Sequence, residues 1–175
     1  MGTGAIGGYY GGRLAAAGND VTFIARGAQL EALRNNGLKV TSPLGDFTVD
    51  PAAATDDPAE VGPVDVVMFM VKNYDTEAAA RQIKPLVGDA TAVVSFQNGV
   101  SAPDILIAEL SAEHVLGGVA QIPASVPEPG VISHNGEIAK LIFGEFDNTA
   151  SVRCETFRAA LEDAELDTDI RVIVL

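Results

Sequence analysis

The chain has 175 residues, 47% of them apolar, which suits one globular domain, or slightly more, with a substantial core. Its 11 basic and 24 acidic residues give a net charge of −13, which disfavours nucleic acid and anionic membrane surfaces as partners. No run of about 18 apolar residues and no signal-peptide pattern is present, so we expect neither a membrane span nor export. The single cysteine, Cys154, cannot form an internal disulfide, which suits a reducing cytosol.

A glycine-rich sequence follows Met1 directly and fits the pattern G-x-G-x-x-G. In a βαβ unit the first glycine makes a tight turn, the second admits a pyrophosphate, and the third lets the helix pack closely on the sheet. The pyrophosphate then lies at the N-terminus of the helix, where free N–H groups attract negative charge. The pattern predicts a dinucleotide-binding turn made of Gly2, Thr3, Gly4, Ala5, Ile6 and Gly7.

The residues after this turn support a βαβ unit. A helix is predicted over 5–17, a helix end at 18–19 and a short strand over 21–25. An alternative stays open, because three further glycines on the helix could serve close packing against a sheet without any ligand. These are Gly8, Gly11 and Gly12.

The strand that should precede the turn is missing from the sequence. In this topology that strand is central, so its absence leaves unpaired backbone groups and apolar surface on its neighbours. Burying five or six such residues is worth on the order of 10 kcal/mol, which is comparable with the stability of a whole domain. We therefore expect a segment before Met1, a partner chain that supplies a strand, or a chain that folds poorly.

The remaining residues alternate predicted strands and helices. Strands are predicted over 38–40, 46–50, 64–71, 91–96, 114–120, 130–134 and 140–144, and helices over 28–35, 76–87 and 102–110. The first two strands form a hairpin, and the strand 64–71 is apolar enough to be buried on both faces. Asp75 is the expected N-cap of the helix that follows it, and 125–129 reads as a Pro-rich turn. This order predicts an α/β, Rossmann-type, doubly wound and mostly parallel sheet.

Three polar residues stand at the ends of predicted strands, where ligands bind in such sheets. Arg26 occupies the position where an acidic residue usually selects NAD, and its guanidinium fork suits the 2′-phosphate of NADP. Lys72 and Asn98 end the next two strands, along the crevice for the nicotinamide half. The alternative to a coenzyme-binding role is that Arg26 is an ordinary exposed arginine. For Lys72 and Asn98 the alternative is that they are ordinary solvated or turn residues.

Other kinds of catalytic site find no support. His114 and His134 are far apart in the sequence, and there is no H-E-x-x-H pattern or Cys/His cluster, so we expect no metal site and assign both histidines structural roles. No G-x-S-x-G element suggests nucleophilic catalysis. The acidic tail over 155–169 is interpreted as a solvated face.

The chain resembles the ketopantoate reductase (2-dehydropantoate 2-reductase) family over essentially all of its length. The resemblance rests on Gly2-Thr3-Gly4-Ala5-Ile6-Gly7-Gly8, Phe23-Ile24-Ala25-Arg26-Gly27, Val71-Lys72, Phe96-Gln97-Asn98-Gly99 and Glu128-Pro129-Gly130-Val131-Ile132-Ser133-His134. It implies NADPH-dependent reduction of 2-dehydropantoate to pantoate, a cytoplasmic step of pantothenate and coenzyme A synthesis. A 2-oxo acid is the implied partner, and assembly into a homo-oligomer stays open.

The resemblance also implies roles for single residues. The glycine turn matches the pyrophosphate loop and Arg26 the 2′-phosphate contact, while Lys72 and Asn98 match positions beside nicotinamide and substrate, with supporting catalytic roles. Ala124 matches a further backbone contact to the coenzyme.

Family members continue into a helical domain that holds the lysine acting as the acid. We therefore expect residues 1–165 to form the NADP-binding domain, 166–175 to begin the connection to that helical domain, and the chain alone to be inactive. The alternatives are a non-catalytic NADP-binding or regulatory module, and a reductase of another 2-oxo acid.

Overall fold

The computed structural model describes residues 1–147 and 149–170, which form an α/β fold with three sheets. The helices are α1 (Ala5–Ala16), α2 (Gly27–Asn36), α3 (Thr76–Gln82), α4 (Ala102–Leu110) and α5 (Val152–Asp163). The strands are β1 (Phe23–Ile24), β2 (Leu38–Thr41), β3 (Phe47–Val49), β4 (Ala54–Thr55), β5 (Val66–Phe69), β6 (Ala92–Ser95), β7 (Val115–Gln121), β8 (Ala124–Glu128), β9 (Val131–His134), β10 (Lys140–Gly144) and β11 (Asp167–Ile170). None of the helices in the described part of the chain is long and apolar enough to cross a bilayer.

The sheets are mixed, so the prediction of a mostly parallel sheet is confirmed in part: among the described residues, five strand pairings are parallel and three are antiparallel. The largest has the order β11-β10-β7-β6-β5, and a four-stranded sheet has the order β3-β2-β9-β8. β5, β6 and β7 are parallel because α3 and α4 carry the chain back between them. No helix lies between β7 and β10, and these two strands pair antiparallel. β1 and β4 form a separate parallel pair.

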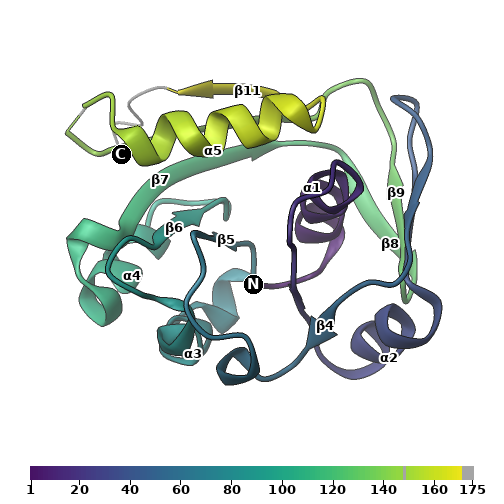
Figure 1. Ribbon diagram of the computed structural model, residues 1–175, viewed down its shortest axis with the longest axis horizontal. Coiled ribbons are helices and arrows are strands. Elements are labelled where there is room, and N and C mark those ends of the chain that lie inside the picture. The colour runs from purple at the N-terminus through teal and green to yellow at the C-terminus, as the bar shows by residue number, and fades with distance from the viewer. Residues whose placement is uncertain (148, 171–175) are drawn as a thin grey trace.

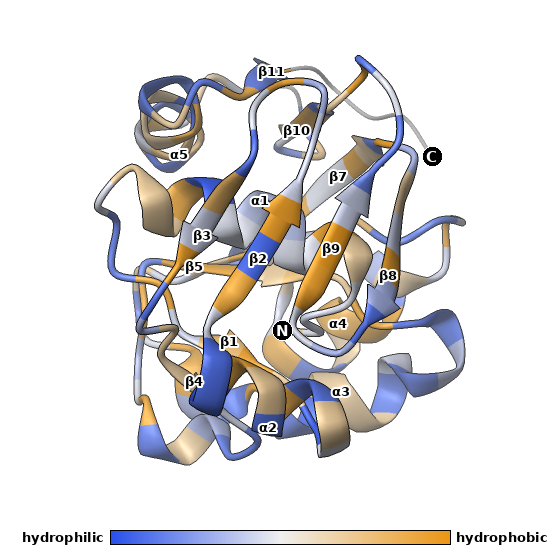
Figure 2. Ribbon diagram, turned by 90° about the vertical axis from the view of Figure 1, so that its right-hand side faces the viewer, coloured by the Kyte–Doolittle hydropathy of each residue, from blue (hydrophilic) through white to orange (hydrophobic). Residues whose placement is uncertain are grey.

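Helix α1 packs against the four-stranded sheet, which faces the viewer in Figure 2. Its glycines make this close approach feasible. A Cβ at Gly8 would lie 2.8 Å from the Ile132 side chain, and one at Gly12 would lie 2.9 Å from the Leu38 side chain. Tyr9 and Tyr10 of the same helix are fully buried. These additional glycines therefore serve helix–sheet packing beside the glycine turn.

Two predicted elements differ from the structure. The helix predicted over 76–87 ends at Gln82, and a short 3₁₀ turn over Lys84–Leu86 follows. Pro85 explains this end, because its ring lacks an N–H group and clashes with the preceding helical turn. The turn predicted at 125–129 is β8, an edge strand with an irregular register between Ser125 and Glu128. Pro127 is tolerated in an edge strand at such an irregularity.

The carboxyl-terminal part contains two elements that the sequence interpretation left out. Helix α5 begins at Ser151, whose hydroxyl accepts a hydrogen bond from the Cys154 N–H at 3.3 Å. Strand β11 pairs parallel with β10, although we expected residues 166–170 to start a connection. Residues 171–175 lie outside the described residues. In Figure 1, α5 and β11 lie over the long strand β7.

The first two residues join two sheets in the middle of the molecule (Figure 1). The Met1 amine donates to the Met68 carbonyl of β5 at 2.8 Å, and the Gly2 N–H donates to the Ile24 carbonyl of β1 at 3.2 Å. A cavity of about 1040 Å³ lies between β1 and β5 and is lined in part by Met1 and Gly2. Val66 and Met68 are therefore only partly buried, although we predicted their strand to be buried on both faces.

Candidate functional site

The glycine turn has a geometry that only glycine satisfies at two of its positions. Gly2 has a φ of +88°, and a Cβ there would lie 2.8 Å from the Val71 nitrogen. A Cβ at Gly7 would lie 2.4 Å from the Gly2 carbonyl oxygen. Gly4 differs, because a Cβ there would meet no atom within 4 Å. The first and third glycines thus close the turn on the protein, and the second faces open space.

Helix α1 presents free backbone donors at this turn. Its N-cap is Gly4, no side chain caps it, and its first turn holds no acidic residue. The first described backbone hydrogen bond runs from the Gly8 N–H to the Gly4 carbonyl at 2.8 Å, which leaves the N–H groups of Ala5, Ile6 and Gly7 without a described partner. Such a helix N-terminus favours a negatively charged group.

Thr3 faces the protein interior. Its hydroxyl donates to the Ile24 carbonyl at 3.1 Å, and the residue is 7% exposed. Its backbone N–H donates to the same carbonyl at 3.2 Å, so Thr3 holds the glycine turn against β1.

Arg26 lies beside the glycine turn, just after β1. Its side chain is 78% exposed, and one Nη donates to a carboxylate oxygen of Asp75 at 2.7 Å. This is the one described hydrogen bond of the guanidinium, so most of its donors are open to a ligand. Asp75 occupies the N-cap position of α3, as predicted, but its side chain makes no capping hydrogen bond.

Lys72 and Asn98 lie at the same edge, because they follow the parallel neighbours β5 and β6. Both residues are exposed, and the Lys72 ammonium has no described partner. The Asn98 carbonyl accepts a hydrogen bond from the Asn73 side-chain amide at 3.0 Å, which ties the two loops together. The structure thus brings together Arg26, Lys72 and Asn98 as the sequence predicted, at the carboxyl ends of three strands.

Gln97 is a further residue of this edge that the sequence interpretation did not single out as a site residue. Its Nε2 donates to the Val71 carbonyl at 2.8 Å and to the Thr76 hydroxyl at 2.9 Å. The residue is 9% exposed, and its Oε1 is buried without a described partner. The available signal in the sequence was a glutamine that closely follows a predicted strand, within the motif Phe96-Gln97-Asn98-Gly99. Gln97 holds the backbone before Lys72 in place.

Ala124 lies in another sheet, at the start of β8, opposite His134.

The His134 ring is 2% exposed and bonds to the Ser42 hydroxyl at 2.8 Å and the Ile138 carbonyl at 3.0 Å. His114 bonds to the Thr91 carbonyl at 3.0 Å. These contacts fit the structural roles expected for both histidines. In the described residues, no group of three or more His, Cys, Asp or Glu side chains could hold a metal ion.

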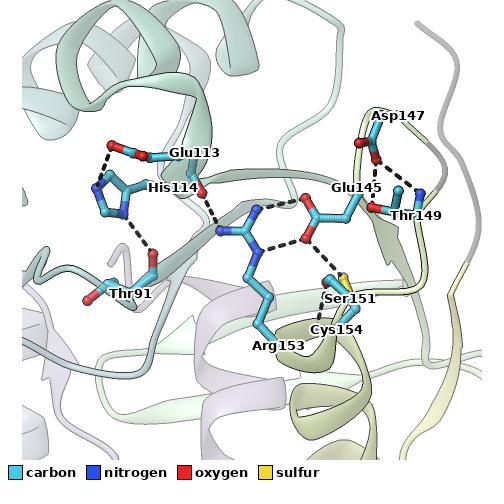
Figure 3. Close-up of polar contacts among 9 residues, drawn as sticks. All are labelled: Thr91, Glu113, His114, Glu145, Asp147, Thr149, Ser151, Arg153 and Cys154. Carbon is cyan, nitrogen blue, oxygen red and sulfur yellow. Dashed lines mark hydrogen bonds and ion pairs between the residues drawn. The ribbon is translucent and has the colours of Figure 1, made fainter.

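A second charged group lies where β10 meets α5 (Figure 3). Arg153 donates two hydrogen bonds to the Glu145 carboxylate, both at 2.7 Å, and another to the Glu113 carbonyl. The guanidinium holds the pKa of Glu145 below its usual range. Burial raises the pKa of the neighbouring Cys154 thiol, which disfavours the reactive thiolate. This group is saturated by its own contacts and fastens α5 to the sheet.

The residues of the glycine turn fit a dinucleotide. Gly4 leaves room for close approach, the free N–H groups of α1 suit a pyrophosphate, and the open fork of Arg26 suits a further phosphate. An α/β sheet with such a turn at its carboxyl edge defines a dinucleotide-binding domain of the Rossmann class. Within that class, residues 1–148 match the family model described as Ketopantoate reductase PanE/ApbA. The chain belongs to this family of NAD(P)-dependent oxidoreductases.

Individual proteins agree with this assignment. The chain is 34% identical over 174 residues to an uncharacterized oxidoreductase of Bacillus subtilis, YkpB, covering 99% of this chain and 55% of that protein. It is 32% identical over 192 residues to a 2-dehydropantoate 2-reductase of Mesorhizobium japonicum, covering 98% and 58%. A crystal structure of 2-dehydropantoate 2-reductase from Geobacter metallireducens superposes with a TM-score of 0.91 at 36% identity, covering 98% of this chain and 56% of that one. The chain thus spans little more than half the length of the curated relatives it matches.

Proposed function

We propose that this chain is the NADPH-binding half of a reductase that converts 2-dehydropantoate to pantoate. The observation that carries the proposal is the open guanidinium of Arg26, which lies beside a glycine turn with free helix N–H groups. Similarity to proteins named 2-dehydropantoate 2-reductase supports the choice of substrate.

The residues of the edge take separate roles in this function. Residues 2–7 form the pyrophosphate loop, in which the N–H groups of Ala5, Ile6 and Gly7 have no described partner and bind the pyrophosphate, and Arg26 binds the 2′-phosphate. Lys72 and Asn98 orient the nicotinamide and the carbonyl of the 2-oxo acid, and Ala124 supplies a backbone contact. Bound NADPH supplies the hydride, whereas the protein binds and orients the reactants.

The acid that completes the reduction belongs to a second domain. Reduction of a ketone needs a proton donor near the developing alkoxide. The exposed Lys72 ammonium has no hydrogen-bond partner among the described residues that would hold it as a proton donor, and we assign it the role of polarising the carbonyl. We assign residues 1–170, which include β11, to coenzyme binding and the catalytic lysine to a helical domain. The chain by itself is then inactive, and the complete enzyme works in the cytoplasm.

We propose that one further strand, parallel to β1 and β5, fills the cavity between them. Alternate residues of a strand bond to opposite neighbours, and Met1 bonds to β5 whereas Gly2 bonds to β1. An apolar strand that continues this alternation would pair the remaining edge groups of both strands and fill the cavity of about 1040 Å³. Adding five apolar residues before Met1 should therefore raise the thermal unfolding temperature. An unchanged temperature would contradict this placement.

The test of coenzyme binding is a calorimetric titration of the chain with NADPH and then with NADH. We expect tighter binding of NADPH, and we expect Arg26→Ala to weaken it by at least about tenfold, since a charged hydrogen bond to phosphate is lost. Arg158→Ala is the matched control, because it removes a partly exposed arginine from α5. If the folded chain bound neither coenzyme, the proposal would be wrong.

A second candidate keeps the coenzyme and changes the substrate. YkpB, at 34% identity, is named only as an uncharacterized oxidoreductase, so similarity to this family does not select one 2-oxo acid. The distinguishing experiment joins the chain to the helical domain of a full-length relative. NADPH oxidation with 2-dehydropantoate favours the first candidate, and oxidation only with other 2-oxo acids favours the second.

A further inference from the structure

The coenzyme edge is the group formed by residues 1–7, Arg26, 72–75 and 97–98. Arg26 and Asp75 form an ion pair that joins two elements of this edge. Arg26 follows β1 and Asp75 precedes α3, 49 residues later in the sequence. The Nη2–Oδ2 distance is 2.7 Å, and the Asp75 side chain is 27% exposed against 78% for Arg26. The carboxylate is thus held in place at the position of the arginine that would receive a 2′-phosphate.

Asp75 has no other role in the described residues. It stands at the N-cap position of α3, where an aspartate side chain commonly bonds to the helix N–H groups, yet it makes no such bond. Its own backbone N–H donates to the Lys72 carbonyl at 2.9 Å, which fixes its position in the loop. The contact with Arg26 is therefore the one described hydrogen bond of the carboxylate.

The two coenzymes place opposite demands on this pair. A 2′-phosphate needs the guanidinium and is repelled by a carboxylate beside it. A 2′-hydroxyl gains from a carboxylate that accepts its proton in a hydrogen bond, as the acidic residue of NAD-binding domains does. Arg26 and Asp75 satisfy one demand each.

We propose that Asp75 is a specificity-determining residue, which competes with the 2′-phosphate of NADPH for Arg26 and accepts the 2′-hydroxyl of NADH. The inference rests on the proposed function and deepens it, since Asp75 narrows the preference that Arg26 creates. The chain then binds both coenzymes, and the ratio of their affinities depends on which of the two side chains is present.

The test is Asp75→Asn, which keeps the shape of the side chain and removes its charge. Calorimetric titrations of the variant should give a lower Kd for NADPH and a higher Kd for NADH. The ratio of the two Kd values should change by about tenfold, because one coenzyme loses a charged competitor and the other loses a charged acceptor. The same variant should bind adenosine 2′,5′-bisphosphate more tightly relative to 5′-AMP, which localises the effect to the 2′ position.

Glu77→Gln is the matched control, because it removes a carboxylate that is 72% exposed and pairs with Arg81 of the same helix. It should leave the ratio within about twofold, since exposed charges are screened by salt. A ratio that stays within twofold in Asp75→Asn as well, or that moves toward NADH, overturns the inference while leaving the proposed function intact. Binding of neither coenzyme by the unaltered chain overturns both.

Discussion

The coenzyme edge and the carboxyl-terminal corner each contain an ion pair between an arginine and a carboxylate, which is exposed at the edge and partly buried in the corner. The coenzyme edge comprises residues 1–7, Arg26, 72–75 and 97–98, and the corner comprises Glu145, 151–154 and the Glu113 carbonyl. At the edge, Arg26 is 78% exposed and makes one hydrogen bond to a carboxylate. In the corner, Arg153 is 27% exposed and makes two, with a third to a carbonyl.

This difference in exposure and hydrogen bonding determines whether an ion pair stabilises the fold or stays available to bind a ligand. A bidentate, partly buried pair fixes its elements and leaves few donors for a ligand. An exposed pair contributes little to stability because water screens it, but its charges stay available. The corner therefore holds α5 on the sheet, and the edge remains open for a phosphate.

The largest predicted effect concerns the amine of Met1, beneath the glycine turn. Burial lowers its pKa in the folded chain to about 5, from 8.0. Between these values the unfolded chain binds one proton more, so the free energy of unfolding should rise with pH by about 1.4 kcal/mol per unit from pH 5 to 8. Urea denaturation across this range measures the slope, and acetylation of the amine should remove it.

The corner should not add to that slope. Arg153 lowers the pKa of Glu145 from 4.5, so the stability contributed by this carboxylate is present above pH 4.5 and is lost as the pH falls through the lower folded value. A slope between pH 5 and 8 that survives acetylation would show that the amine is not its source.

The next effect is on the corner itself. Arg153→Met should lower the free energy of unfolding by about 3 kcal/mol, because it leaves the Glu145 carboxylate, 13% exposed, without its partner. The affinity of the folded variant for NADPH should stay within about twofold. Urea denaturation and calorimetry measure the two quantities. Arg158→Met, at a side chain that is 42% exposed, should cost less than about 0.5 kcal/mol.

A third prediction compares two glycines of the turn. Gly7→Ala should cost about 2 kcal/mol of stability, since its Cβ would lie 2.4 Å from the Gly2 carbonyl oxygen. Gly4→Ala should leave stability within about 0.5 kcal/mol, because its Cβ meets no protein atom. Both variants should bind NADPH at least about tenfold more weakly. Unchanged binding by folded Gly4→Ala would contradict the role of the turn.

The smallest effect on stability should come from Arg26→Ala. Its exposed ion pair with Asp75 should contribute no more than about 0.5 kcal/mol. Thermal unfolding without coenzyme should therefore be nearly unchanged in this variant, although its affinity for NADPH falls. A marked loss of stability would place Arg26 with Arg153 as a structural residue.

Regions that depend on interactions between residues close in the sequence could be predicted, whereas contacts between residues far apart in the sequence could not. The glycine turn, α1 and the hairpin of β2 and β3 were predicted closely, because glycine spacing and local apolar patterns specify them. The strand ends at Arg26, Lys72 and Asn98 could also be located, since parallel strands place their carboxyl ends at one edge. The interactions of Asp75 and Gln97 could not be predicted, because they depend on side chains that meet only after folding.

By itself, the sequence determined the turn, most of the helices and strands, and the family resemblance, since these depend on backbone propensities and short spacings. The tertiary structure alone decided that the Asp75 side chain bonds to Arg26 and does not cap α3, and that Gln97 bonds to the backbone of another loop. It likewise decided that Arg153 pairs with Glu145. It also decided that β10 pairs antiparallel with β7 and that β11 completes the sheet. The physical reason is that such pairings are chosen among many partners by packing and burial, which no local pattern records.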